Sequence, residues 1–139
     1  MDMAPAKLIY KQSAAIPVRQ NAKGVWQVLM ITTRHRRRWI FPKGMVEPYL
    51  NAATSAAKEA LEEAGVTGYM ENIPLGVFET TKWRGGCEVE VYALFVESQL
   101  DKWQEDFRKR RWVDLNFAIK EVDEPGFIPA LEQLCQRLL

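Results

Sequence analysis

The sequence predicts an α+β fold, a mixed β-sheet with helices packed against it, in one domain. The predicted elements follow in the order β-β-loop-α-β-β-α, which is typical of a sheet covered by helices. The length of 139 residues suits a single domain, and the 47% hydrophobic content is ordinary for a globular protein. We found no internal repeat, low-complexity tract or linker.

The first predicted pair of elements is a β-hairpin. Residues 8–19 form the first predicted strand, in which Pro17 indicates a sheet edge or a bulge because proline cannot donate to a strand ladder. Residues 20–24 (QNAKG) are typical of a turn, and residues 25–33 (VWQVLMITT) form the second predicted strand.

A short helix is predicted at residues 52–64. Asn51 is a favourable N-cap, and Gly65 suits the left-handed position that ends a helix. One side of this helix carries Glu59, Glu62 and Glu63, because they are spaced i, i+3 and i+4. The opposite side, predicted to pack on the sheet, carries Ala53, Ala57, Ala60, Leu61 and Ala64.

The second half of the chain contains two predicted strands, a short strand entry and a closing helix. The strands are residues 75–81 and the longer 87–97, with a loop at 82–86 between them, and the strand entry is residues 108–113. The helix spans residues 126–139 and has one apolar stripe formed by Ile128, Leu131, Leu134, Cys135 and Leu138.

The three glutamates of the first helix are placed unfavourably for stability. Like charges at these spacings repel, and the end of a helix disfavours anions. Converging carboxylates do suit a hard divalent cation such as Mg²⁺. A solvated acidic face is the alternative, but the loop of residues 39–48, with Pro42, Gly44 and Pro48, leads directly into this helix and favours a metal site.

Loop and helix together resemble the Nudix box, G-x5-E-x7-R-E-U-x-E-E-x-G-U, where U is aliphatic. Leu50 stands where the family has Glu, and Lys58 stands where it has Arg. The joint loss of that acid and base is consistent with compensation, in which Leu50 packs and Lys58 keeps a positive charge beside Glu59. The other fixed positions are occupied by Gly44, Glu59, Ala60, Glu62, Glu63, Gly65 and Val66.

The resemblance implies a Nudix-type αβα sandwich over residues 1–139. It implies Mg²⁺, with Mn²⁺ as a possible substitute, held by Glu59, Glu62 and Glu63 and by a backbone carbonyl near Lys43. The implied reaction is hydrolysis of a phosphoanhydride bond by a metal-activated water, with Glu59 or Glu63 as the catalytic base and Glu121 as a further candidate. The alternative, suggested by Leu50, is a non-catalytic module that binds a nucleotide or an inositol phosphate.

Basic residues concentrate in two segments, 34–38 and 108–111, which together hold eight of them. Such clusters suit a polyanionic substrate, although for any single one of these residues solvated surface is the more common role. Short segments outside the box resemble the diphosphoinositol polyphosphate phosphohydrolase branch, whose members also cleave diadenosine polyphosphates. The chain departs from that branch at Ser13, where the branch carries Arg, and its 80–87 loop looks longer. The predicted substrate-binding residues are Lys11, Arg34, Arg38, Lys43, Gly44, Lys82, Arg84, Arg108 and Arg110.

Composition limits the kinds of partner, cellular location and chemistry that the sequence allows. A net charge of +1 argues against a nucleic-acid partner, so the partner we expect is a small polyphosphate, bound by a monomer or homodimer. Two cysteines make no disulfide framework. The amino terminus lacks a signal-like apolar run, and no apolar stretch is long enough for a membrane span, which predicts a cytoplasmic protein. A single histidine disfavours Ser-His-Asp chemistry.

Overall fold

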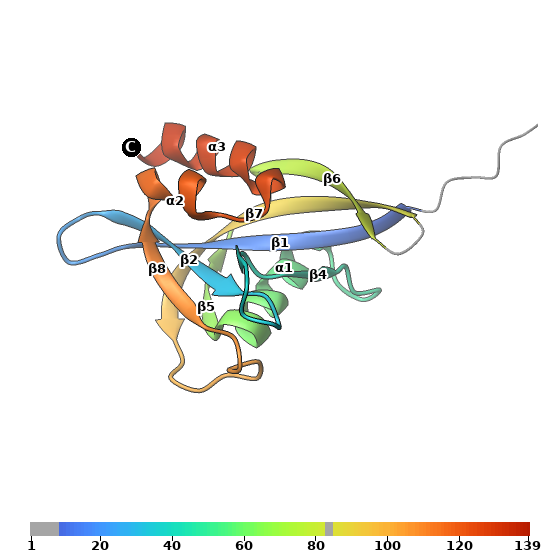
Figure 1. The fold of residues 1–139 in the computed structure, drawn as a ribbon, viewed down its shortest axis with the longest axis horizontal. Helices are drawn as coiled ribbons and strands as arrows, with labels where there is room; N and C mark the ends of the chain where they lie inside the picture. The colour runs from blue at the N-terminus through green and yellow to red at the C-terminus, as the bar shows by residue number, and fades with distance from the viewer. Residues whose placement is uncertain (1–8, 83–84) are drawn as a thin grey trace, which may run out of the picture.

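The computed structural model describes residues 9–82 and 85–139, with only the backbone of Lys82 included (Figure 1). Eight strands in these ranges form one mixed sheet. They are β1 Ile9–Gln20, β2 Trp26–Thr32, β3 Trp39–Ile40, β4 Lys43–Met45, β5 Val66–Met70, β6 Gly76–Lys82, β7 Gly85–Gln99 and β8 Arg110–Asp114. The helices are α1 Ala52–Glu59, which continues as a π-helical turn over Ala60–Ala64, α2 Leu115–Glu121, a 3₁₀ turn at Pro125–Phe127, and α3 Ile128–Leu138.

Strand β1 is the centre of the sheet. It runs parallel to β7 over ten residues, from Ile9 opposite Gly86 to Val18 opposite Phe95. On its other side β1 pairs antiparallel with β4 and then with β2, so the predicted β1–β2 hairpin is confirmed. Strands β5 and β6 both pair antiparallel with β7, at different points along it.

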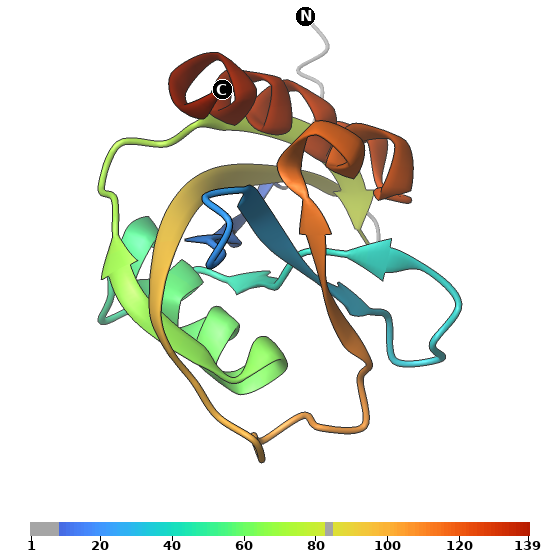
Figure 2. The same ribbon diagram turned by 90° about the vertical axis from the view of Figure 1, so that its left-hand side faces the viewer.

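Helices cover both faces of the sheet, which confirms the predicted αβα sandwich. Figure 1 shows α2 and α3 on one face and α1 on the other, and in Figure 2 the red α3 lies across β6 while the green α1 lies beyond the central strands. The side chains of β1 alternate between two cores. Ile16 packs in the core under α2 and α3, and Ala15 packs in the core under α1.

Pro17 lies in this central strand, so the prediction of an edge or a bulge is wrong. The N–H of Ala15 donates to the carbonyl of Pro42 (3.0 Å), and the nitrogen of Pro17 faces the same way because strand residues alternate. The pairing with β4 ends at Ala14, and the pairing with β2 begins at Val18. Proline is tolerated because its missing N–H falls in the gap between two successive partners.

Four elements were not predicted: β3, β4, β5 and α2. Strands β3 and β4 have two and three residues, too few for a periodic pattern, and they form only because β2 and β1 lie beside them. The predicted loop at residues 82–86 is also wrong, because it is too long. Pairing in the β6–β7 hairpin reaches Lys82 opposite Gly85, because the glycines join the strand and leave only residues 83–84 between the paired positions.

The predicted apolar stripe of the last helix is confirmed. Leu131 and Leu134 are fully buried, and the stripe's other members pack against the same core. The core beneath the helix is centred on Phe127, whose ring meets Phe41 and Phe78 edge-on at 5.1 Å each. Among the residues that the structure describes, no helix has the length and apolar character needed to cross a membrane.

Candidate active site

Helix α1 begins and ends as its sequence predicts. The Asn51 side chain accepts a hydrogen bond from the Thr54 N–H (2.8 Å), which satisfies one of the unpaired donors at the helix start. Gly65 takes a left-handed conformation with φ 67°, which ends the helix. The Gly65 N–H also donates to the Ala60 carbonyl, and this hydrogen bond closes the π-helical turn that contains Glu62 and Glu63.

The buried face of this helix is rotated toward Glu63 relative to the prediction. Ala56 is fully buried and Glu63 is 6% exposed, whereas Leu61, predicted to pack on the sheet, is 39% exposed. The predicted face is therefore wrong at Leu61. The cause is that a glutamate carboxyl, and not a leucine, points toward the sheet, where it finds polar partners.

Glu59 and Glu63 meet at strand β4. The Glu59 carboxylate lies so close to Gly44 that a Cβ built on Gly44 would be 2.4 Å from the Glu59 Cδ. The Lys43 N–H donates to Glu63 Oε1 at 3.3 Å. The strand thus supplies a backbone donor to one carboxyl and a side-chain-free surface to the other.

Burial, and after it the hydrogen bond with Glu59, together raise the pKa of Glu63 to about 9. Burial also raises the pKa of Glu59. Because Glu63 is buried and in hydrogen-bond contact with the half-buried Glu59, we expect the two carboxyl groups to share a proton in the absence of a cation, with the proton on Glu63.

Glu62 has a different partner. Its carboxylate pairs with Lys58 at 2.7 Å, and Lys58 also contacts Glu47 at 3.4 Å. Leu50 is 38% exposed, so the expectation that Leu50 packs is wrong. The acidic partner for Lys58 comes instead from Glu47, in the loop three residues earlier, so an acid–base pair is kept without a glutamate at position 50.

These residues fit a hard divalent cation in donor chemistry. In the described ranges, no three His, Cys, Asp or Glu side chains stand close enough together to hold one ion, because Glu62 is turned toward Lys58. The carboxyl oxygens of Glu59 and Glu63 nevertheless lie together beside strand β4. The Glu59 carboxylate can approach this strand so closely only because Gly44 has no side chain. Oxygen ligands of this kind suit Mg²⁺ or Mn²⁺, and a cation would replace the shared proton.

Glu105 is a neighbour that the sequence analysis missed. Its N–H donates to the Glu62 carbonyl (2.9 Å), and its carboxylate accepts from Arg108 (3.0 Å). The charge of Glu105 also contributes to the raised pKa values of Glu59 and Glu63. No motif marks it, because it lies in the loop between β7 and β8 and reaches the box through tertiary structure alone.

The family model described as "NUDIX domain" matches residues 10–133 of this chain. The chain belongs to the NUDIX domain family.

Named relatives agree with this membership. The chain is 38% identical over 118 residues to "Nudix hydrolase 13, mitochondrial" of Arabidopsis thaliana, an alignment that covers 77% of this chain and 58% of that protein. It is 33% identical over 130 residues to "Diphosphoinositol polyphosphate phosphohydrolase 3-beta" of Homo sapiens, covering 90% of this chain and 78% of that protein. The chain thus spans little more than half the length of the plant relative.

Solved structures support the same fold. A Caenorhabditis elegans Ap4A hydrolase in a binary complex superposes with a TM-score of 0.78 at 20% identity, covering 93% of this chain and 97% of that one. A likeness at this low sequence identity shows that the two chains share a fold.

The basic residues around the Nudix box are mostly engaged by protein groups. Lys43 Nζ pairs with Glu124 at 2.6 Å, beside a pocket of about 390 Å³ that Arg38 also lines. Arg38 donates to the Asp123 carbonyl at 2.9 Å. Lys43 and Gly44 therefore lie beside the box glutamates, since the Lys43 N–H contacts Glu63 and Gly44 contacts Glu59. Arg38 lines the pocket beside Lys43.

The other predicted cations are more dispersed. Arg108 is buried and donates to Glu105 and to the Thr32 carbonyl (2.8 Å), and its charge opposes the rise in the pKa of Glu63. Lys11 pairs with Glu88 at 2.7 Å on the sheet, and Arg34 is exposed over the Phe107 ring. Arg84 and the side chain of Lys82 lie outside the described residues.

Glu121 is not brought to the box. Its carboxylate pairs with Arg111 at 2.7 Å, and both side chains are substantially exposed. Of the three candidate bases, Glu59 and Glu63 are therefore the two that the fold places at Gly44.

Arg110, a predicted phosphate ligand, is bound into the end of the box helix. It donates to the Ala64 carbonyl (2.8 Å) and to the Leu100 carbonyl, and it stacks on Trp103 at 3.8 Å. Trp103 in turn donates to the Glu63 carbonyl (3.0 Å). We expect Arg110→Ala to lower the free energy of unfolding by about 2 kcal/mol, measured by chemical denaturation, because two charge-assisted hydrogen bonds are lost.

Arg110→Lys is the matched variant, since it keeps the charge but loses the planar stacking and one of the two carbonyl contacts. If Arg110 serves the helix, both variants lose stability while KM changes less than threefold. A large rise in KM at unchanged stability would show instead that Arg110 binds the substrate phosphate, as the sequence predicts.

Proposed function

We propose that this chain is a hydrolase dependent on Mg²⁺ or Mn²⁺ that cleaves a phosphoanhydride bond in a small polyphosphate substrate. The observation that carries the proposal is the contact between half-buried Glu59 and buried Glu63 at strand β4, where Gly44 leaves room for the Glu59 carboxylate, in a NUDIX family domain. Burying two acids next to each other costs stability, and a cation site accounts for that cost.

Glu59, Glu62 and Glu63 would hold the cation, with Glu62 released from Lys58. When bound, such an ion polarises phosphate oxygens and lowers the pKa of a water molecule. The chain's own residues supply the remaining functions. Lys58 and Glu47 fix the orientation of the outer part of the helix, and Arg108 holds Glu105 beside the box.

In this proposal Glu59 and Glu63 carry out the proton transfer. The carboxyl that has lost its shared proton accepts one from the attacking water, and Glu59 or Glu63 is placed to do so. Lys43, at the same strand, is the cation that a substrate phosphate would take from Glu124 by charge-assisted hydrogen bonding. The names of the relatives suggest diphosphoinositol polyphosphates or dinucleoside polyphosphates as substrates.

The non-catalytic alternative loses its main support. It rested on Leu50 replacing a box glutamate, and Glu47 provides Lys58 with an acidic partner in its place. We therefore propose catalysis over binding alone, and we retain the predictions of a single domain over residues 1–139, a cytoplasmic location and a monomeric or homodimeric state.

The proposal is tested by phosphate release with Mg²⁺ from diphosphoinositol polyphosphates, diadenosine penta- and hexaphosphate, ADP-ribose and nucleoside triphosphates. The Glu62→Gln/Glu63→Gln protein is assayed in parallel. We expect turnover of at least one substrate, reduced at least 100-fold in the double variant. Absence of turnover on every substrate, with retained tight binding of one, would show a binding module instead.

A further inference from the structure

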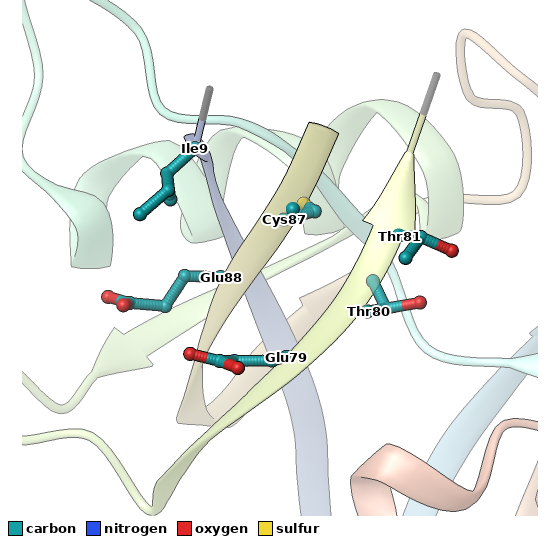
Figure 3. A pocket seen from close by; sticks show the side chains of 7 residues that line it. Ile9, Glu79, Thr80, Thr81, Cys87 and Glu88 are labelled. Atoms are coloured by element: carbon teal, nitrogen blue, oxygen red, sulfur yellow. The ribbon is translucent and has the colours of Figure 1, made fainter. Parts of the chain in front are cut away.

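Three glutamates share one face of the β6–β7 hairpin. Glu79 and Glu88 are directly opposite each other in register, and Glu90 lies two residues further along β7 on the same face. In Figure 3 the side chains of Glu79 and Glu88 point to the same side of their strands, together with Ile9 of β1. Like charges directly opposite each other destabilise a sheet, so stability does not account for this acidic face (Glu79, Glu88, Glu90).

The acidic face adjoins the box glutamates. Gly44, which contacts Glu59, pairs with Ser13 across β4 and β1, and Ser13 pairs with Glu90 across β1 and β7. Two strand spacings amount to about 10 Å. Two residues further along these strands, Ala15 and Tyr92 pack in the core under α1, so Ser13 and Glu90 also face the α1 side.

Ser13 provides a second, independent observation. Its Oγ is fully buried, and it is the one buried side-chain nitrogen or oxygen in the described residues that has no hydrogen-bond partner. Native proteins rarely leave such a group unpaired. Because Ser13 stands between Gly44 and Glu90, a polar ligand group lying across β1 would give it a partner.

The negative charge of the acidic face determines which kind of ligand group can bind there. Lys11 is the neighbouring cation in the described part of the chain, and it is already paired with Glu88 at 2.7 Å. Glu90 accepts a hydrogen bond from the Tyr92 hydroxyl, which orients its carboxylate. Carboxylates only accept hydrogen bonds and repel phosphates, so the group that lies here presents N–H donors and carries no phosphate.

We propose that the acidic face binds the guanine base of the substrate, so that the chain acts on guanosine polyphosphates and rejects inositol polyphosphates. This inference rests on the proposed function of the box glutamates. Guanine carries N1–H and a 2-amino group side by side, two donors that match the two oxygens of a carboxylate. The adjacent pocket of about 290 Å³, lined by Ile9, Glu79 and Glu88, combines apolar and acidic surface for a planar ring.

Calorimetric binding tests the inference without requiring turnover. With Mg²⁺, we expect GDP to bind at least tenfold more tightly than IDP, which lacks the 2-amino group, or ADP, and more tightly than inositol hexakisphosphate. Glu88→Gln/Glu90→Gln should abolish the preference for GDP over IDP. Glu97→Gln, at the exposed end of the same strand, is the matched control and should retain the preference.

Equal binding of GDP and IDP by the wild type would overturn the inference, as would an unchanged preference in the double variant or tighter binding of inositol hexakisphosphate. Thermal unfolding of each variant checks the fold. The kinetic counterpart compares hydrolysis of diguanosine and diadenosine tetraphosphate. Absence of hydrolysis with a retained GDP preference would refute the proposed function alone, whereas hydrolysis without a base preference would refute only the present inference.

Discussion

Replacing Glu63 with Gln is expected to raise the thermal stability of the metal-free protein at pH 8 and to abolish Mg²⁺-dependent hydrolysis. Burial and the Glu59 contact raise the pKa of Glu63 from 4.5 to about 9. Between these two pH values the folded state binds more protons than the unfolded state, so stability falls as pH rises. Gln stays neutral and can still donate to Glu59, so the variant avoids this loss, which is on the order of a few kcal/mol.

The measurement is the melting temperature in EDTA from pH 5 to pH 9. The wild type should lose stability over this range while Glu63→Gln changes much less, with a difference of about 5 °C or more at pH 8 and little at pH 5. Glu62→Gln is the control, since Glu62 pairs with Lys58 and should leave the pH slope in place. Parallel pH profiles for wild type and Glu63→Gln would show that Glu63 titrates normally.

With Mg²⁺ present, the wild type should have a higher melting temperature than Glu63→Gln, the reverse of the order in EDTA. A cation that replaces the shared proton binds only the folded state and stabilises it in proportion to the logarithm of its concentration. We expect Mg²⁺ to raise the melting temperature of the wild type more at pH 8 than at pH 6, because less proton has to be displaced at the higher pH. Glu63→Gln should show little response at either pH.

The parts of the site that the sequence predicted are those that depend on local spacing. Asn51 and Gly65 cap the helix through local contacts, and the i, i+4 spacing keeps Glu59 and Glu63 together. Glu62, three residues after Glu59, turns instead toward Lys58. The hairpin of β1 and β2 follows from a turn between two apolar runs for the same reason.

Partner choice across the sheet was not predictable in this way. Lys11 and Glu88 are 77 residues apart, and Lys43 and Glu124 are 81 apart, so their pairing depends on the parallel alignment of β1 with β7 and on where the 3₁₀ turn falls. The sequence analysis predicted that basic residues from two segments and from the loops around the box bind the substrate. The fold gives most of the described ones an acceptor within the protein.

Gly44→Ala is expected to reduce kcat/KM by at least 100-fold with little loss of stability. The added Cβ would lie 2.4 Å from both Cδ and Oε1 of Glu59. The obstructing atoms are the far end of a flexible side chain, so the carboxylate moves and the backbone stays. A displacement of about 1 Å in a catalytic carboxylate costs on the order of 10²-fold in rate.

Gly76→Ala is the matched control, because its Cβ would meet Ala130 only at ordinary contact distances of 3.9 and 4.0 Å. Both variants should unfold within about 1 kcal/mol of the wild type, since neither enters a position of positive φ. Kinetics with saturating Mg²⁺ then separate two roles of Gly44. A lower kcat with unchanged KM places the defect at Glu59 and the cation, whereas a higher KM alone would mean that Gly44 makes room for the substrate and not for the carboxylate.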